Sequence, residues 1–418
     1  MKEEFINYLW ENRLLSKDLR TVDGESVQVI SVGNRNYDAG PDFLDARISI
    51  GQTLWVGHVE VHVSASDWFR HGHQYDDAYK NVILHVVYCN DTELLSIPTV
   101  EIKNQFDESI YERYTGFVKS RRWIPCERFI AGIQQFTWLS WLERIVVERL
   151  EVEVKDVFST LAATHFDWEE TLYQRIMRYC GLKVNNDAFE RLARLLPLRI
   201  LRKHIDDPVQ VAAMFFGCAG FLDQEFTEDY PVLLQREFKV LKSKFNLIVM
   251  PRVYWKFLRL RPPNFPTVRL AQMAAMVCSY DNFLSKLQAV DDLESMRNLF
   301  NVEVDTYWDT HFLFERPSKE KKKNFGATAT DILIINAVIP VLFSYGIYHD
   351  NQEMKNKSLG FLSEMAPEDN VVIRRFEKLG VSACNAQQTQ ALLQLYNSYC
   401  RRRKCLNCRV FNAIKTID

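Results

Sequence analysis

The chain has 418 residues, of which 47% are hydrophobic and 25% charged, and its formal net charge is −2. This balance is typical of globular domains and excludes a disordered chain, and the length suits two or three domains. A globally basic nucleic-acid binder is not indicated, although a local basic patch stays open.

The N-terminal segment MKEEFINYLWENRLL is acidic and amphipathic, which is not the pattern of a secretory signal. The most apolar window, residues 332–348, is shorter than a membrane span and contains Asn336 and Pro340, so we expect a buried core helix. Six of the nine cysteines are scattered singly, as buried thiols in a reducing compartment would be. We therefore expect a cytoplasmic protein without membrane contact.

Residues 1–125 predict an α/β (or α+β) head. Helical spacing indicates a first helix over residues 2–15, and a short helical stretch is expected around 76–80. Strands are expected at 26–32, 43–50, 53–63, 82–88 and 98–102. Gly51-Gln52 gives the tight link of a hairpin between the second and third of these strands. The sequence therefore predicts a mixed sheet of about five strands.

From residue 136 onward helical spacing dominates, and we assign residues 126–418 to a mostly α-helical body. Helices are expected at 138–157, 168–179, 188–195, 209–221, 231–245, 268–277, 331–345 and 387–399. No fixed repeat period runs through this region, which argues against a regular solenoid.

Five of the nine histidines lie between positions 58 and 85. Alternation along GHVEVHV places His58, Glu60 and His62 on one strand face and the valines on the other. Imidazole and carboxylate groups two residues apart can converge on one Zn²⁺, Mn²⁺ or Fe²⁺ ion. Further candidates on the neighbouring segments are Asp42, Asp45, His71, His73, Asp76 and Asp77. The alternative is a polar strand face in water with incidental surface histidines.

Pro41-Asp42 followed, after a hairpin, by Glu60-Val61-His62 resembles the PD-(D/E)xK nuclease superfamily. The resemblance implies a restriction-endonuclease-like head in which Asp42 and Glu60 bind Mg²⁺ or Mn²⁺, with Glu4 or Glu11 as helpers. Asp42, Glu60 and His62 would then be the catalytic residues. His62 stands where the family has lysine; a neutral imidazole can act as base or ligand but supplies no permanent cation.

Over its whole length the chain also resembles an uncharacterised bacterial family known only as a domain of unknown function. The segments that carry this resemblance are DAGPDFLDARI, WVGHVEVHVSASDW, NVILHVVY, LRPPNFPTVRLAQ and YCRRRKCLNC. The resemblance implies no activity. The sequence contains no nucleophile elbow, P-loop or dinucleotide fingerprint, which argues against the common chemistries that use them.

The body ends in a cysteine cluster at 400–408, with Cys400-x4-Cys405-x2-Cys408 beside a basic turn. This spacing is typical of a metal knuckle, and nearby cations favour the thiolate form. A structural zinc ion, an iron–sulfur cluster and free thiols all stay open. A fourth ligand is missing locally, and Cys384, His349 or a histidine of the head could complete the set.

Segment 251–269 mixes cations with aromatic residues, a combination that can grip phosphates and stack bases. The candidate nucleic-acid contacts are Lys256, Arg259, Arg261 and Arg269. The alternative is a helix with its aromatics in the core and its cations reaching solvent.

Three hypotheses about function are compatible with the sequence. The first is a metal-dependent phosphodiesterase, nuclease-like, that acts on nucleic acid. The second is a metal-dependent enzyme on another substrate that uses His58, Glu60 and His62. The third is a non-catalytic protein whose helical body binds a partner.

Overall fold

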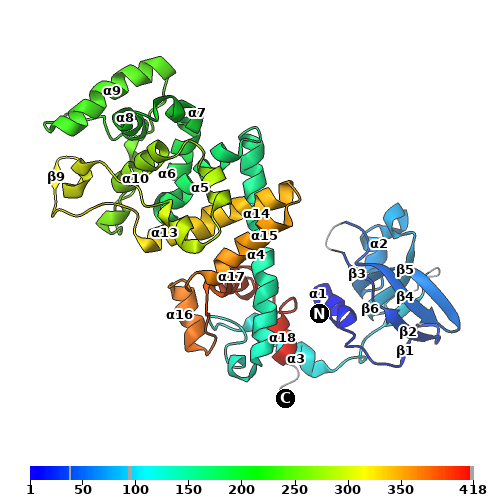
Figure 1. Cartoon of the computed structure of the whole chain (residues 1–418). Helices are drawn as coiled ribbons and strands as arrows, with labels where there is room; N and C mark the ends of the chain where they lie inside the picture. The colour runs from blue at the N-terminus through cyan, green and yellow to red at the C-terminus, as the bar shows by residue number, and fades with distance from the viewer. Residues whose placement is uncertain (37–38, 93–96, 415–418) are drawn as a thin grey trace. The chain divides into compact units, whose positions relative to one another are not determined.

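The computed structural model describes residues 1–36, 39–92 and 97–414. The chain forms two compact units (Figure 1). The first combines Met1–Trp138 with Tyr396–Asp418, and the second is Leu139–Leu395. The sequence suggested one boundary near residue 125, whereas the units divide at Trp138 and again at Leu395. The C-terminal segment therefore returns to the unit that contains the head.

The first unit is built on a mixed seven-stranded sheet, which confirms the expected mixed α/β head. Its strands are β1 (Leu19–Arg20), β2 (Ser26–Ser31), β3 (Asn34–Arg35), β4 (Phe43–Ile50), β5 (Thr53–Ser64), β6 (Val82–Cys89) and β7 (Thr99–Glu101). The order is β1-β2-β4-β5-β6-β7, with β3 paired to β4. Strands β2, β4 and β5 are antiparallel, while β5, β6 and β7 are parallel. Five strands match the expected ones, and the additional β1 and β3 are too short to show a sequence period.

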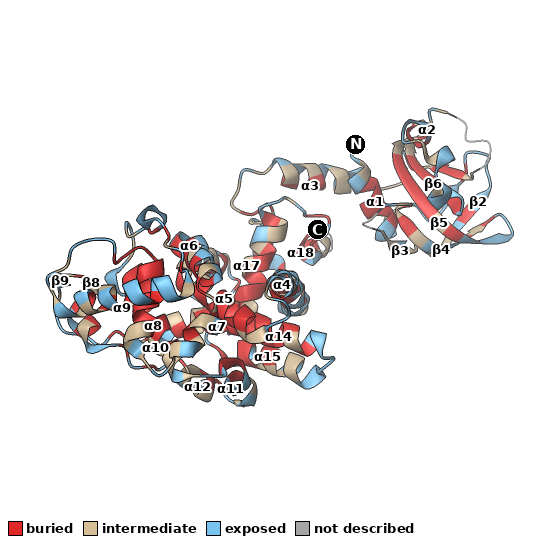
Figure 2. Ribbon diagram, turned by 90° about the horizontal axis from the view of Figure 1, so that it is seen from above, coloured by how far each residue is buried: buried red, intermediate tan, exposed pale blue. Residues whose placement is uncertain are grey.

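The middle of this sheet is buried (Figure 2). Along β5 the side chains alternate, and Val59 and Val61 are fully buried on one face while Glu60 and His62 occupy the other. In β6, Leu84 and Val86 pair with the two valines, and His85 pairs with Glu60. The valine-rich face thus holds the apolar core, and the opposite face carries a buried polar row.

The helices of the first unit are α1 (Glu3–Glu11), α2 (Asp67–Arg70), α3 (Glu108–Lys119), α18 (Arg409–Ile414) and the start of α4 (Gln135–Ala163). In α1, Phe5 is fully buried and stacks on Tyr114 of α3 with ring centroids 5.3 Å apart. Tyr8 of α1 contacts Phe411 of α18 edge-on and donates its hydroxyl to Asn412 at 2.8 Å. The C-terminal helix therefore completes the core beside α1.

A β-bulge at the start of β4 shapes the edge where the polar row begins. Register with β5 shifts between Phe43 and Ala46, and Asp45 in the bulge has a φ of 57°. Gly33 lies against this bulge, and a Cβ there would come within 2.6 Å of the Leu44 carbonyl oxygen. Glycine at position 33, with a φ of 88°, is what allows the two backbones to approach.

The second unit is mostly helical, as expected. Beyond α4 its helices are α5 (Trp168–Cys180), α6 (Leu182–Leu195), α7 (Leu198–Leu201), α8 (Pro208–Cys218), α9 (Asp229–Phe245), α10 (Pro266–Ser279), α11 (Phe283–Ala289), α12 (Leu293–Asn298), α13 (Ala327–Leu333), α14 (Ile339–Tyr348), α15 (Gln352–Glu364), α16 (Val371–Lys378) and α17 (Ala386–Gln394). A two-stranded ribbon, β8 (His311–Leu313) with β9 (Arg316–Pro317), interrupts them. Asp167 caps α5 by accepting the Glu170 N–H, as its place before the helix indicated.

The most apolar segment forms a core helix. In the described part of the chain, Ala327–Tyr348 is the one helix long and apolar enough to cross a membrane, and 67% of its apolar window is buried within the fold. A π-helical turn at Ile334–Val338 separates α13 from α14, just before Pro340. Proline has no N–H for the helical ladder, and the wider turn accommodates it.

Candidate metal centre

Two carboxylates interlock across β4 and β5. The backbone N–H of Asp42, just before β4, donates to Glu60 Oε2 at 3.0 Å. In return the N–H of Val61 donates to Asp42 Oδ2 at 3.3 Å. Each carboxylate is thus fixed by the backbone of the other's strand. Asp42 and Glu60 therefore share one end of the polar row, as the sequence predicted.

The first helix adds polar groups to Asp42. Asn7 of α1 donates to Asp42 Oδ1 at 3.4 Å, and Arg35 Nη1 lies 3.6 Å from the same oxygen. Glu3 lies one helical turn before Asn7, and burial together with the Asp42 charge raises the pKa of Glu3 to about 7. The carboxylate of α1 beside the site is therefore Glu3, whereas Glu4 and Glu11 are exposed.

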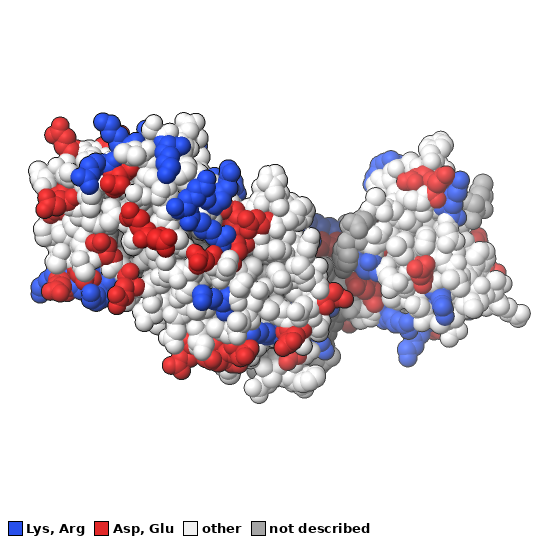
Figure 3. Space-filling view, turned by 45° about the horizontal axis from the view of Figure 1, so that its top comes forward, with Lys and Arg blue, Asp and Glu red and all other residues white. Residues whose placement is uncertain are grey.

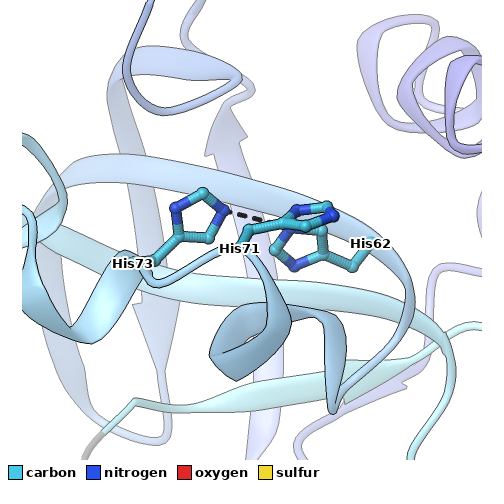
Figure 4. Close-up of side chains that lie close together, drawn as sticks. All are labelled: His62, His71 and His73. Carbon is cyan, nitrogen blue, oxygen red and sulfur yellow. Dashed lines mark hydrogen bonds between the residues drawn. The ribbon is translucent and has the colours of Figure 1, made fainter.

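Three histidines gather at the other side of Glu60. The Nε2 atom of His62 lies 3.2 Å from His71 Nδ1 and 3.3 Å from His73 Nε2. One ligand nitrogen from each ring lies within 4.8 Å of those of the other two (Figure 4). His62 comes from β5, while His71 and His73 come from residues 65–81, the crossover that leads to β6. His62 is buried and His71 exposed, so the group reaches the surface on one side.

Glu60 joins the carboxylates to the histidines. Its Oε1 lies 3.5 Å from His62 Nε2 and 3.4 Å from His73 Nε2. The residue is only 4% exposed. Burial, and next the charge of Asp42, raise the pKa of Glu60 to about 9. Without a cation this carboxyl is therefore protonated at neutral pH.

A further layer of side chains orients the imidazoles. His85 Nε2 lies 2.8 Å from His62 Nδ1, and Trp68 packs edge-on against His85 at 5.5 Å between ring centroids. Tyr79 stacks on His73 at 3.8 Å. Outer partners of this kind fix the tautomer and direction of metal-binding histidines. They leave His62 Nε2 directed at His71 and His73.

Three of the imidazoles, those of His62, His73 and His85, are uncharged at neutral pH. Burial, followed by the neighbouring imidazoles, lowers the pKa of His62 to about 2. Burial likewise lowers the pKa of His85 to about 3, and that of His73 falls below its usual value. Neutral imidazole is the form that binds metal ions. The neutral imidazoles therefore offer nitrogen lone pairs to a metal ion. The carboxyl group of Glu60 carries a proton that a bound cation would displace.

The structure brings together Asp42, Glu60 and His62 from the predicted site and adds His71 and His73 to them. It places His58 differently, because His58 Nδ1 accepts the Asp45 N–H at 3.3 Å inside the bulge. Asp45 and Asp77 are exposed, and Asp76 accepts the Ala78 N–H at 2.9 Å. His58 therefore lies apart from the imidazoles that gather at Glu60, and the second and third imidazoles of that group come from the crossover.

Glu3, Asn7 and Arg35 were not among the predicted site residues. The i, i+4 spacing of Glu3 and Asn7 on an amphipathic helix was the sequence signal that places these two side chains on one face. A cavity of about 340 Å³ lies beside α1 and β2, lined by Trp10, Leu19 and Val29 among others. None of the site residues lines it.

The predicted nucleic-acid contacts lie in the second unit and divide into two kinds. Lys256, Arg259 and Arg261 are exposed on an irregular segment, not on the helix that was the alternative. Arg269 lies inside α10, only 5% exposed, and donates to Asn264 at 2.7 Å and Gln272 at 2.9 Å. Its guanidinium makes hydrogen bonds within the core. The prediction that Arg269 contacts phosphates is therefore wrong. Acidic and basic side chains are interspersed on the face shown in Figure 3.

Comparison with known proteins identifies the family. The chain belongs to the family described as Protein of unknown function (DUF2851), which matches residues 3–371. No curated protein and no solved structure matches the chain.

Proposed function

We propose that this member of the DUF2851 family is a divalent-metal-dependent phosphodiesterase that acts on nucleic acid. The observation that carries the proposal is the contact of Glu60 with both halves of the site. One carboxylate oxygen meets the Asp42 backbone, and the other lies within 3.5 Å of His62 and His73. The buried carboxyl group of Glu60 and the half-buried one of Asp42, beside neutral imidazoles, form a donor set that suits Mn²⁺, Mg²⁺ or a related ion.

The order of elements supports a nuclease-like head. Helix α1 is followed by the antiparallel strands β2, β4 and β5, a crossover with a short helix, and β6 parallel to β5. The PD-(D/E)xK resemblance implies this order, with the aspartate at the start of one core strand and the glutamate on the next. Asp42 immediately precedes β4, and Glu60 lies on β5.

Arg35 offers the positive charge that His62 lacks. A neutral His62 supplies no cation, whereas Arg35 keeps its charge and lies 3.6 Å from Asp42. In this proposal Asp42 and Glu60 hold the ion, Arg35 faces the phosphate, and His62 acts as a ligand. When bound, the ion supplies a polarised phosphate oxygen and a water of lowered pKa.

A second candidate follows from the histidines. His62, His71 and His73 together with Glu60 are a nitrogen-rich donor set, which suits Zn²⁺ or Fe²⁺ better than Mg²⁺. Such a site would serve a metal-dependent reaction on a substrate other than nucleic acid. Metal selectivity separates the two candidates, because the phosphodiesterase should work with Mg²⁺ or Mn²⁺.

The test is cleavage of single- and double-stranded DNA and RNA by the full chain, first stripped of metal and then supplied with Mg²⁺ or Mn²⁺. We expect cleavage only with the ion, and a loss of about 10²-fold or more in Asp42→Asn and Glu60→Gln. Asp45→Asn is the matched control, because Asp45 is an exposed carboxylate near Asp42 and outside the site. No cleavage of any of these substrates by metal-loaded protein would refute the phosphodiesterase and favour the second candidate.

A further inference from the structure

A second group of metal-ligating side chains lies in the first unit, apart from the carboxylates and histidines. Cys400, Cys405 and Cys408 are each less than 9% exposed. The fourth member of the group is Cys126, from the segment that follows α3. We propose that Cys126, Cys400, Cys405 and Cys408 hold one iron–sulfur cluster.

Two chain segments bring the four cysteines together. Arg403, in the turn after Cys400, donates to the carbonyl oxygens of Ser120 at 2.9 Å and Arg122 at 3.3 Å. Trp123 stacks on Tyr396 with ring centroids 4.9 Å apart. Residues 120–126 are therefore fixed against residues 396–408, although some 270 positions separate them in the sequence.

The backbone of the C-terminal segment folds around its thiols. The N–H of Arg403, whose φ is 58°, donates to the Cys400 carbonyl at 3.2 Å. The N–H of Cys408 donates to the Cys405 carbonyl at 3.0 Å, and α18 begins at the next residue. Two tight turns thus hold Cys400, Cys405 and Cys408 together in one short, buried segment.

The electrostatics of the four thiols agree with this grouping. Burial, and then the neighbouring cysteines, raise the pKa of Cys126, with Cys408 and Cys405 as the neighbours. Burial and Cys408 raise the pKa of Cys405 to about 12, and the pKa of Cys400 also lies well above its usual value. Arg403 acts in the opposite direction on Cys400 and Cys405. Iron would displace the four protons to solvent and compensate the charges of the resulting thiolates.

The spacing of the cysteines along the chain favours a cluster over a single zinc ion. Cys400, Cys405 and Cys408 follow the pattern C-x4-C-x2-C, with four and then two residues between them. This pattern, together with a fourth cysteine distant in the sequence, is one that holds iron–sulfur clusters. Cys126 is the distant cysteine in this chain.

Two of the three candidates for the fourth ligand, Cys384 and His349, belong to the second unit. Cys384 is exposed, and His349 packs on Tyr345. Cys126 belongs to the first unit, as the other three do. A centre on these four residues would join the two stretches of chain that form the first unit, on either side of the inserted second unit.

The test is iron and acid-labile sulfide analysis, with visible absorption spectra, of the full chain purified without oxygen or reconstituted with Fe²⁺ and sulfide. We expect iron and acid-labile sulfide in equal amounts, about two or about four of each per chain. Cys126→Ser should lose the iron as completely as Cys405→Ser does, while Cys384→Ser, a matched change at an exposed thiol, should keep it. Zinc in place of iron, no metal, or full iron in Cys126→Ser would overturn the proposal.

A second measurement uses the wild-type chain, so it does not depend on whether the cysteine variants fold. Alkylation of the loaded protein, followed by mass spectrometry, should find Cys126 protected together with Cys400, Cys405 and Cys408, and all four should react after iron is removed by a chelator. Equal alkylation of Cys126 before and after iron removal would exclude it from the centre.

Discussion

Asp42 and Glu60 are each held by the other's backbone: the Asp42 N–H donates to Glu60 at 3.0 Å, and the N–H that follows Glu60 donates to Asp42 at 3.3 Å. Two carboxyl groups in reciprocal contact on adjacent strands repel each other when ionised. Burial makes this repulsion stronger, so the pair retains a proton until a cation replaces it.

Glu60→Gln should change the response of the protein to pH and to metal. The pKa of Glu60 is raised to about 9, so the folded state keeps its proton between about pH 4.5 and 9 while the unfolded state loses it. Metal-free wild type should therefore lose stability relative to Glu60→Gln as pH rises from 5 to 8, by at most about 1.4 kcal/mol per pH unit. Chemical denaturation across this range measures the difference.

Mn²⁺ provides the control for that experiment. At pH 8 the ion should stabilise the wild type, because it binds the folded state alone, and should have little effect on Glu60→Gln. Equal stabilisation of both proteins would show that Glu60 takes no part in holding the ion.

Arg35→Gln should separate catalysis from metal binding. Arg35 lies 3.6 Å from Asp42, and in the proposed reaction it would provide the permanent charge that faces the phosphate. Its loss should lower cleavage by about 10²-fold and leave the affinity for Mn²⁺ unchanged or tighter, because a neighbouring cation is removed. Calorimetric titration with Mn²⁺ beside the cleavage assay measures both quantities. Weaker Mn²⁺ binding in Arg35→Gln would show that Arg35 only positions the carboxylate of Asp42 for the metal ion.

His62→Lys tests whether position 62 acts as the lysine of the nuclease motif. His62 Nε2 lies within 3.3 Å of His71 and His73, so we expect a ligand role. A buried ammonium group there would repel the ion, and both metal binding and cleavage should be lost. His58→Lys, on the same strand and outside the trio, is the control. Cleavage that survives or rises in His62→Lys would assign the lysine role to this position instead.

The basic residues of the second unit should affect nucleic-acid binding through salt dependence. Replacing Lys256, Arg259 and Arg261 with alanine should weaken binding for all sequences and lower the salt slope by about 0.9 per lost phosphate contact. Arg269→Ala should instead destabilise the fold by ~2 kcal/mol, because its buried partners Asn264 and Gln272 lose their hydrogen bonds. Binding measured at several salt concentrations, together with melting, distinguishes the two effects. An unchanged salt slope in the triple variant would show that these three residues do not contact the phosphates of the nucleic acid.

Most of the secondary structure of the head could be predicted from local sequence patterns. The alternation along β5 and the hairpin at Gly51 predicted the strands and the shared face of Glu60 and His62, because a two-residue period is a property of the strand itself. The bulge was not predictable: a positive φ at Asp45 depends on Gly33, which lies against it from a different segment. That bulge engages His58 and explains why this histidine stands apart from the others.

Contacts between distant segments could not be predicted from the sequence either. Cys126 stands alone in the sequence, and the contacts of Arg403 with Ser120 and Arg122 join its segment to the C-terminal cysteines. His71 and His73 were visible as nearby histidines, yet the fold of the crossover decides that they, and not His58, meet His62. Spacing along a strand identifies the face of a side chain but not the loop that covers it.

The most direct test of the metal centre is anomalous scattering from crystals of the full chain grown with Mn²⁺. We expect one anomalous peak within about 2.5 Å of carboxylate oxygens of Asp42 and Glu60 and close to His62 Nε2. A peak at other residues, or none at saturating Mn²⁺, would contradict the proposed metal centre.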